Sequence, residues 1–141
     1  ACLAGVRSRY DGHSCPHRCL EAIARLGVVI PVCPEILGGM GIPRPRCRFL
    51  GGDGEEVLAG MARVIDLHGR DRTPLFLRGA RETMRIVETV SPDLILFKEG
   101  SPSCGVRRVD VEGRKAEGRG VTTALLLRAG IPIISEDDSW P

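Results

Sequence analysis

The chain has 141 residues, of which 43% are hydrophobic and 27% charged, and no apolar run approaches the ~20 residues of a membrane-spanning helix. These values predict one soluble globular domain over residues 1–141. The net charge of +2 is too small to indicate nucleic-acid binding, and we interpret the clustered arginines as solvated. Six cysteines without a visible signal peptide favour a reducing compartment, so we expect the cytoplasm.

The first third of the chain predicts one helix and one strand. Pro16 opens a helix whose apolar residues favour one face, and Gly27 ends it. The apolar run Val28–Val32 follows at once and predicts a buried strand. Residues 33–54 are rich in Gly and Pro, so we expect little regular structure there. The first residues, Ala1–Gly5, resemble the end of a structural element, so a further strand is expected upstream of Ala1.

The rest of the chain alternates helices with apolar strands. Residues 57–66 fit a short strand or a helix equally well. The later elements are a helix from Thr73 to before Ser91-Pro92, a strand at Leu94–Lys98, a charged excursion at 106–118, a helix at Val121–Arg128 and a strand at Ile131–Ile134. This alternation predicts an α/β fold, specifically a Rossmann-like parallel sheet with helices on both faces.

Three of the cysteines share a setting. Cys2, Cys33 and Cys104 each lie in or beside a turn that contains Gly or Pro, and the last two follow predicted strands. Because the carboxyl ends of parallel strands meet at one edge of a sheet, these turns are expected to converge. Three convergent thiolates suit a soft metal ion or an iron–sulfur cluster and leave one coordination position open. The alternative is that all three are buried structural cysteines, which are common.

Carboxylates and hydroxyls lie next to these cysteines in the sequence. Glu35 follows Cys33 after one rigid proline, so it is placed to transfer protons beside a bound metal. Ser101 and Ser103 precede the last of the three cysteines and are candidates for orienting water or substrate. Asp11, in the loop after the first cysteine, is a candidate acceptor for a substrate N–H. Each of these residues also fits an ordinary hydrogen bond within a turn.

The other cysteines carry a weaker signal. Cys15 and Cys19 are four residues apart, and His13 and His17 lie nearby, so a zinc site is conceivable. An ordinary helix surface is the favoured interpretation of these four residues. Cys47 has no partner in the sequence, so no function is predicted for it.

Motifs along nearly the whole chain resemble the thiouracil desulfurase family. The matching segments are Ala1-Cys2-Leu3, Arg9-Tyr10-Asp11-Gly12, Pro31-Val32-Cys33-Pro34-Glu35, Gly38-Gly39, Pro43-Arg44-Pro45, Ser101-Pro102-Ser103-Cys104-Gly105 and Gly120-Val121-Thr122. They occur in the family's order, and the two longer cysteine motifs are the most specific. The chain departs from the family in its absent first strand and its three extra cysteines.

The resemblance implies a Rossmann-like domain with a 4Fe-4S cluster held by Cys2, Cys33 and Cys104. The fourth iron would bind the sulfur of a thiolated uracil, and the cluster would act as Lewis acid and sulfur acceptor. Glu35 would shuttle protons, and Ser101 would position or activate the reacting groups. Oxygen from water would then replace sulfur without net redox change.

The predicted activity is therefore the desulfuration of thiouracil or thiouridine to uracil with release of sulfide. The expected partner is a small thiolated nucleobase or nucleoside, for which tRNA is a conceivable source, and no membrane is involved. Two other functions fit the same residues: a non-catalytic iron–sulfur or metal-binding protein that carries sulfur, and a metal-free enzyme with a cysteine nucleophile.

Overall fold

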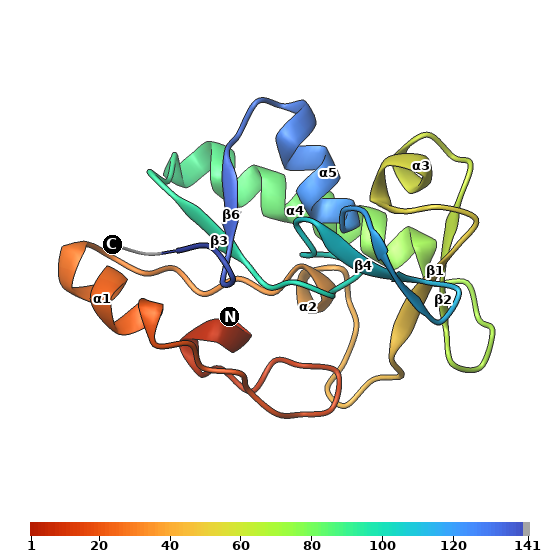
Figure 1. Cartoon of the computed structure of the whole chain (residues 1–141), viewed down its shortest axis with the longest axis horizontal. Coiled ribbons are helices and arrows are strands. Elements are labelled where there is room, and N and C mark those ends of the chain that lie inside the picture. The colour runs from red at the N-terminus through yellow and green to blue at the C-terminus, as the bar shows by residue number, and fades with distance from the viewer. Residues whose placement is uncertain (140–141) are drawn as a thin grey trace.

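Two small sheets and the helices packed on them form the structure (Figure 1), a computed structural model that describes residues 1–139. After a 3-10 turn at Cys2–Ala4, the helices in this part of the chain are α1 (Cys19–Leu26), α2 (Pro34–Leu37), α3 (Gly54–Leu58), α4 (Thr73–Val90) and α5 (Val121–Arg128). The strands are β1 (Cys47–Leu50), β2 (Arg63–Asp66), β3 (Ile95–Phe97), β4 (Arg108–Val111), β5 (Arg114–Glu117) and β6 (Ile133–Ser135).

The larger sheet is mixed, with the strand order β2-β1-β4-β5. β1 is parallel to β4, but β1 and β2 are antiparallel, as are β4 and β5. The prediction of an α/β fold is confirmed, whereas the prediction of a purely parallel sheet is wrong. The charged excursion at 106–118 contains the β4–β5 hairpin, whose turn residues Glu112 and Gly113 have φ angles of 54° and 83°. Two successive positive φ angles make the turn that best joins antiparallel strands.

The smaller sheet pairs β3 with β6 in parallel, with Ile95 opposite Ile133. Its strands, and the helices α4 and α5, lie close to where the sequence predicts them. α4 ends where expected because Ser91, its C-cap, adopts a left-handed conformation just before Pro92. The carboxyl end of β3 leads directly into the loop that carries Cys104.

The predicted strand at Val28–Val32 is wrong, because no strand is assigned there and the Val28 side chain is 91% exposed. Among residues 1–139 no strand pairs with this segment, so the apolar run alone does not make a strand. Residues 33–54, expected to be irregular, contain β1 and α2. The ambiguous stretch 57–66 divides into the end of α3 and the whole of β2.

The core lies between the larger sheet and the helices. Phe49 on β1, Val64 on β2 and Val109 on β4 are at most 1% exposed and form one cluster with Phe76 of α4 and Val121 of α5. Alternate residues of each strand therefore face the helices, as expected for a sheet packed on one side. None of the helices in the described residues is long and apolar enough to cross a membrane.

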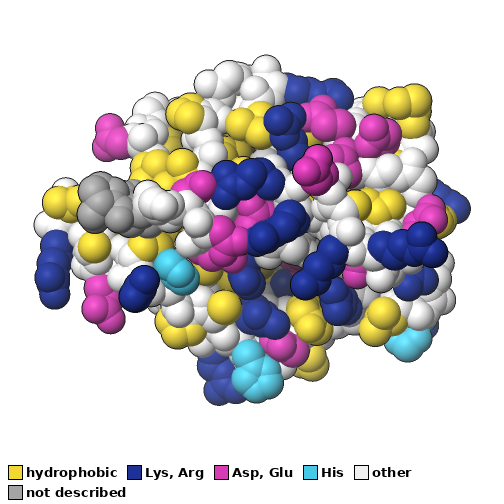
Figure 2. All heavy atoms as spheres, in the orientation of Figure 1, with side chains coloured by type: hydrophobic (Ala, Val, Ile, Leu, Met, Phe, Trp, Pro, Cys, Tyr) yellow, Lys and Arg dark blue, Asp and Glu magenta, His cyan; other side chains and the backbone are white. Residues whose placement is uncertain are grey.

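Charged side chains on the face shown in Figure 2 are interleaved rather than segregated by sign. Arg107 pairs with Asp138 at 2.8 Å, and Arg108 pairs with Asp137. The arginine cluster around residues 107 and 108 is thus largely compensated by nearby acids. This pairing agrees with the interpretation of these arginines as a solvated surface.

Candidate metal centre

A cavity of about 350 Å³ is lined by the turn and loop at the start of the chain, the start of α2, residues 44–47 and the loop after β3. Cys2, Cys33 and Cys104 all line this cavity. The structure thus brings together the three cysteines that the sequence singled out. The predicted polar residues Glu35, Ser101 and Ser103 line it too.

Backbone contacts place Cys2 beside Cys33. The N–H of Ala1 donates to the carbonyl of Val32 at 2.8 Å, so the turn that carries the first cysteine runs next to the residue before the second. This 3-10 turn ends at Gly5, whose φ of 85° suits glycine. The Cys33 thiol lies 3.8 Å from the carbonyl oxygen of Ser8, which belongs to the loop after that turn.

The second cysteine is held in place by the packing of α2 on α4. Cys33 is the N-cap of α2, and Pro34 fits the first helical turn because it lacks an N–H. α2 and α4 touch through Gly38 and Gly79: a Cβ at Gly38 would collide with the carbonyl of Leu75, and one at Gly79 with the carbonyl of Pro34. Gly38 and Gly79 therefore allow the close approach of the two helices that places Cys33 and Glu35 at the cavity.

The loop that carries Cys104 caps the N-terminus of α5. The carbonyl of Pro102 accepts from the N–H of Val121 at 2.9 Å, and the carbonyl of Ser103 accepts from that of Thr122 at 3.0 Å. These bonds satisfy N–H groups that a helix start leaves without partners. Gly120 permits this contact, because a Cβ there would overlap the backbone of Ser103.

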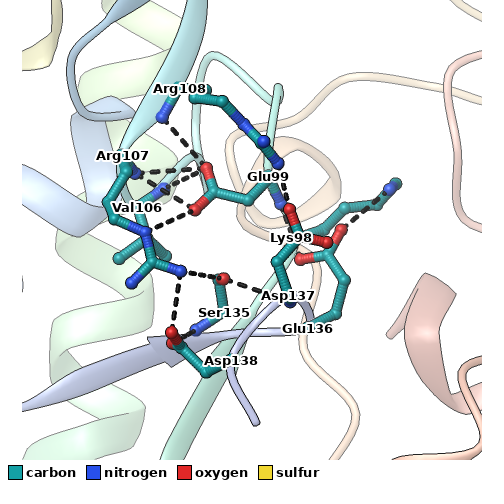
Figure 3. Close-up of polar contacts among 9 residues, drawn as sticks. All are labelled: Lys98, Glu99, Val106, Arg107, Arg108, Ser135, Glu136, Asp137 and Asp138. Atoms are coloured by element: carbon teal, nitrogen blue, oxygen red, sulfur yellow. Dashed lines mark hydrogen bonds and ion pairs between the residues drawn. The ribbon is translucent and has the colours of Figure 1, made fainter.

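The same loop is closed at its base by Glu99, which is 8% exposed (Figure 3). The Glu99 carboxylate accepts hydrogen bonds from the backbone N–H groups of Val106, Arg107 and Arg108 at 3.0 to 3.2 Å. A single buried carboxylate thus holds both ends of the segment that contains Cys104. Its role is not visible in the sequence, because its partners are backbone groups seven to nine residues away.

Lys98 lies at the cavity wall, and Glu136 beyond β6 holds it there (Figure 3). Lys98 Nζ is 3.1 Å from one oxygen of Glu136, and the other oxygen accepts from the N–H of Glu99 at 2.8 Å. Burial opposes the charge on Lys98, but the hydrogen bond to Glu136 and the attraction of nearby negative charges together outweigh burial and raise the pKa of the ammonium group. A cation therefore stands beside the candidate metal site.

Glu35, Ser103 and Ser101 form a chain of hydrogen bonds along the cavity. Ser101 Oγ accepts from the N–H groups of Ser103 and Cys104 at 3.2 and 3.1 Å, so its own proton is free to point to Ser103 Oγ, 3.1 Å away. Ser103 Oγ in turn donates to Oε1 of Glu35 at 3.2 Å. This series of hydrogen bonds runs in one direction and ends on a carboxylate, which makes it suitable for moving a proton.

Arg44 is a site residue that reasoning from the residues missed. Its Nε lies 2.6 Å from Oε2 of Glu35, and the two side chains are 7% and 13% exposed. The sequence did contain one indication of its importance: Arg44 lies in the segment Pro43-Arg44-Pro45, which resembles the family. No role was predicted for that segment.

The thiols at the cavity fit a cluster better than a single metal ion. Burial raises the pKa of Cys104 to about 12 and also raises the pKa of Cys2, so these thiols need a bound cation to ionise. Within residues 1–139, no three His, Cys, Asp or Glu side chains are grouped closely enough to hold one metal ion. A 4Fe-4S cluster binds each cysteine through a different iron, so its ligands stand further apart around a shared space.

The remaining candidate residues either lie outside the cavity or line it while making other contacts. Asp11 is not among the residues that line the cavity; it accepts from the N–H of His13 at 3.0 Å and pairs with Arg9. Cys19 lies 2.9 Å from Nδ1 of His17, in a contact separate from the cavity. Cys47 does line the cavity, but its thiol approaches the carbonyl of Pro45, and burial raises its pKa to about 12.

Comparison with known proteins shows the family to which this chain belongs. Residues 1–138 match the model of the 2-thiouracil desulfurase family, so the chain belongs to that family and the resemblance found in its motifs is confirmed. A solved structure named as the 4Fe-4S-dependent thiouracil desulfidase TudS is similar with a TM-score of 0.80 and 38% identity, over 96% of this chain and 87% of that one. The uncharacterised protein YbbK of Bacillus subtilis (strain 168) is 36% identical over 98% of this chain and 93% of its own length. The predicted cofactor, a 4Fe-4S cluster, is the one on which the enzyme of that solved structure depends.

Proposed function

We propose that this protein is a desulfidase that converts a thiolated uracil to uracil and releases the sulfur as sulfide. The observation that carries the proposal is the convergence of Cys2, Cys33 and Cys104 on one cavity, together with a hydrogen-bonded chain that ends on Glu35. The three cysteines would hold a 4Fe-4S cluster. When bound, the cluster supplies a Lewis-acidic iron and an acceptor for the departing sulfur.

The residues of the chain move the protons. Glu35 accepts a proton from the water that attacks the thiocarbonyl carbon, by way of the Ser103 hydroxyl, and returns it to the departing sulfur. Ser101 keeps the Ser103 hydroxyl directed at Glu35. The water oxygen remains on uracil and the sulfur leaves as hydrogen sulfide, so atoms balance and no electrons are exchanged with another reactant. Lys98 stabilises negative charge that develops at the cavity.

The substrate is a small thiolated nucleobase or nucleoside, either thiouracil or thiouridine, and tRNA breakdown is one source of such compounds. The cavity of about 350 Å³ lies within the range of small-molecule sites and has both apolar and charged walls. None of the six cysteines, all of which lie in the described residues, is in a disulfide, and we place the enzyme in the cytoplasm, where thiols stay reduced.

Purification without oxygen, followed by assays with thiouracil, thiouridine and thiolated tRNA, tests this function. We expect a brown protein that contains iron and labile sulfide and that releases sulfide from at least one of the first two substrates. A protein that holds the cluster but never turns over would instead be a sulfur carrier. A protein that is active without iron would be a cysteine nucleophile enzyme.

The variant Glu35→Gln tests the proton path. The amide keeps the shape of the side chain but cannot take up the proton, so we expect the cluster to be retained and turnover to fall by about 10²–10⁴-fold. Near-normal turnover in a variant with a full complement of iron would exclude Glu35 from the mechanism.

A further inference from the structure

Arg44 touches both the proton carrier and a cluster ligand of the proposed site. Its Nε donates to Glu35 Oε2 at 2.6 Å, and its Nη2 lies 4.0 Å from the Cys33 sulfur. The same Nη2 donates to the carbonyl of Ser8 at 3.0 Å, and Nη1 donates to the carbonyl of Gly41 at 3.2 Å. The planar guanidinium is therefore fixed from several sides in a setting where it is 7% exposed.

The contact with Glu35 divides the two carboxylate oxygens between two tasks. Oε2 is taken by Arg44, whereas Oε1 accepts the hydroxyl of Ser103. Contacts at both oxygens restrict rotation of the carboxylate, so Oε1 stays directed at Ser103. The ion pair thereby reserves Oε1 for proton transfer.

The contact with Cys33 reaches the proposed cluster itself. Cys33 becomes a thiolate when it binds iron, and a charged N–H donor bonds to an anionic acceptor more strongly than to a neutral one. Hydrogen bonds to the sulfurs of an iron–sulfur cluster help to set its reduction potential, because they stabilise the more negative, reduced state.

We propose that Arg44 is a positioning residue that links Glu35 to the cluster by fixing Oε2 and donating an N–H to the Cys33 sulfur. This inference rests on the proposed function. Arg44 acts through these two groups and keeps the proton carrier at a constant position relative to the ligand. Lys98, another cation that lines the cavity, is paired with Glu136 and belongs to a different set of contacts.

The variant Arg44→Lys tests the link, because one ammonium group keeps the charge but loses the planar fork that joins the two partners. We expect kcat to fall by roughly 10²-fold at unchanged KM, as for a small displacement of a catalytic group, and the reduction potential to become more negative. The matched control is Arg72→Lys, whose arginine pairs with the buried Asp66 at 2.9 Å and is not among the residues that line the cavity. The control should keep the wild-type kcat and potential even if its stability falls.

A spectroscopic readout on the unaltered protein completes the test. In protein labelled with ¹⁵N-arginine, electron spin-echo spectra of the reduced cluster should show a nitrogen coupling that Arg44→Lys removes and Arg72→Lys retains. Absence of this coupling in the wild-type protein would overturn the inference, even if Arg44→Lys failed to fold. A fall in kcat at unchanged potential would overturn the link to Cys33. Failure of the wild-type protein to bind a cluster or to turn over would instead contradict the proposed function.

Discussion

Glu99 accepts the backbone N–H of Arg108 at 3.0 Å and so closes the loop that carries Cys104 (Figure 3). The bond joins the segment just after β3 to the first residue of β4, which lie in different sheets. A buried carboxylate with several N–H donors is a rigid clamp, because leaving any of these groups unpaired is costly.

Replacing Glu99 by Gln should therefore loosen the loop. The amide NH₂ cannot accept a hydrogen bond and would face backbone N–H groups, so we expect a loss of about 1–3 kcal/mol in the free energy of unfolding. Iron should also be lost faster to a chelator. Urea unfolding and iron retention measure the two effects. The control is Glu82→Gln, which changes a partly exposed carboxylate paired with Arg85 on α4. Equal stability and equal iron retention in the two variants would contradict the role of Glu99 as a clamp.

Single replacements of cysteine by alanine should separate ligands from other thiols. Cys2→Ala, Cys33→Ala and Cys104→Ala are each expected to lower the iron content after anaerobic reconstitution, because a cluster bound by three thiolates depends on each of them. Cys47→Ala should keep its iron, since that thiol is directed at the carbonyl of Pro45. Full iron content in the first three variants, with loss in Cys47→Ala, would mean that the ligand set is wrong.

Gly120→Ala should displace the Cys104 loop from α5. The added methyl group would overlap the backbone of Ser103, and forced overpacking of this kind costs about 1–3 kcal/mol. We expect lower thermal stability together with a lower iron content. Gly27→Ala is the matched control, because a Cβ at Gly27 meets nothing within 4 Å. Equal iron binding by both variants would contradict the role of Gly120 in packing the Cys104 loop against α5.

Asp66 should make the fold sensitive to acid. Burial disfavours its charge, but hydrogen bonds from the N–H groups of Arg70 and His68 and from the Arg72 guanidinium outweigh burial and lower its pKa below the ordinary 3.8. Because the folded pKa is the lower one, the ionised group stabilises the fold at neutral pH. This stabilisation is lost as the pH falls below about 3.8 and passes through the folded pKa.

The free energy of unfolding of Asp66→Asn, followed from neutral pH into acid, tests this effect. The variant should be less stable than the wild-type protein at neutral pH and should lose less stability as the pH falls. Asp93→Asn, at an exposed position, should follow the wild-type curve. Identical acid profiles for Asp66→Asn and the wild-type protein would contradict the assignment.

The sequence alone determined those features that depend on neighbouring residues. The boundaries of α4 follow from Thr73-Pro74 at its start and Ser91-Pro92 after its end, and β3 follows from a short apolar run. The motifs around Cys33 and Cys104 were sufficient to identify the family, because their residue types and spacing are unusual. Such signals are local, so no knowledge of the distant chain is needed to recognise them.

The tertiary structure alone decided which distant groups meet. The apolar run Val28–Val32 is as strand-like as β3, yet only β3 has a partner strand in the described chain, since pairing depends on what lies alongside. The antiparallel pairing in the larger sheet likewise depends on contacts across the chain. Arg44 contacts a carboxylate and a thiol, and Glu99 binds backbone N–H groups. Folding brings these partners near, although they are distant or unmarked in the sequence. Backbone N–H groups are the same at every residue except proline, so a sequence does not reveal which of them a buried carboxylate will bind.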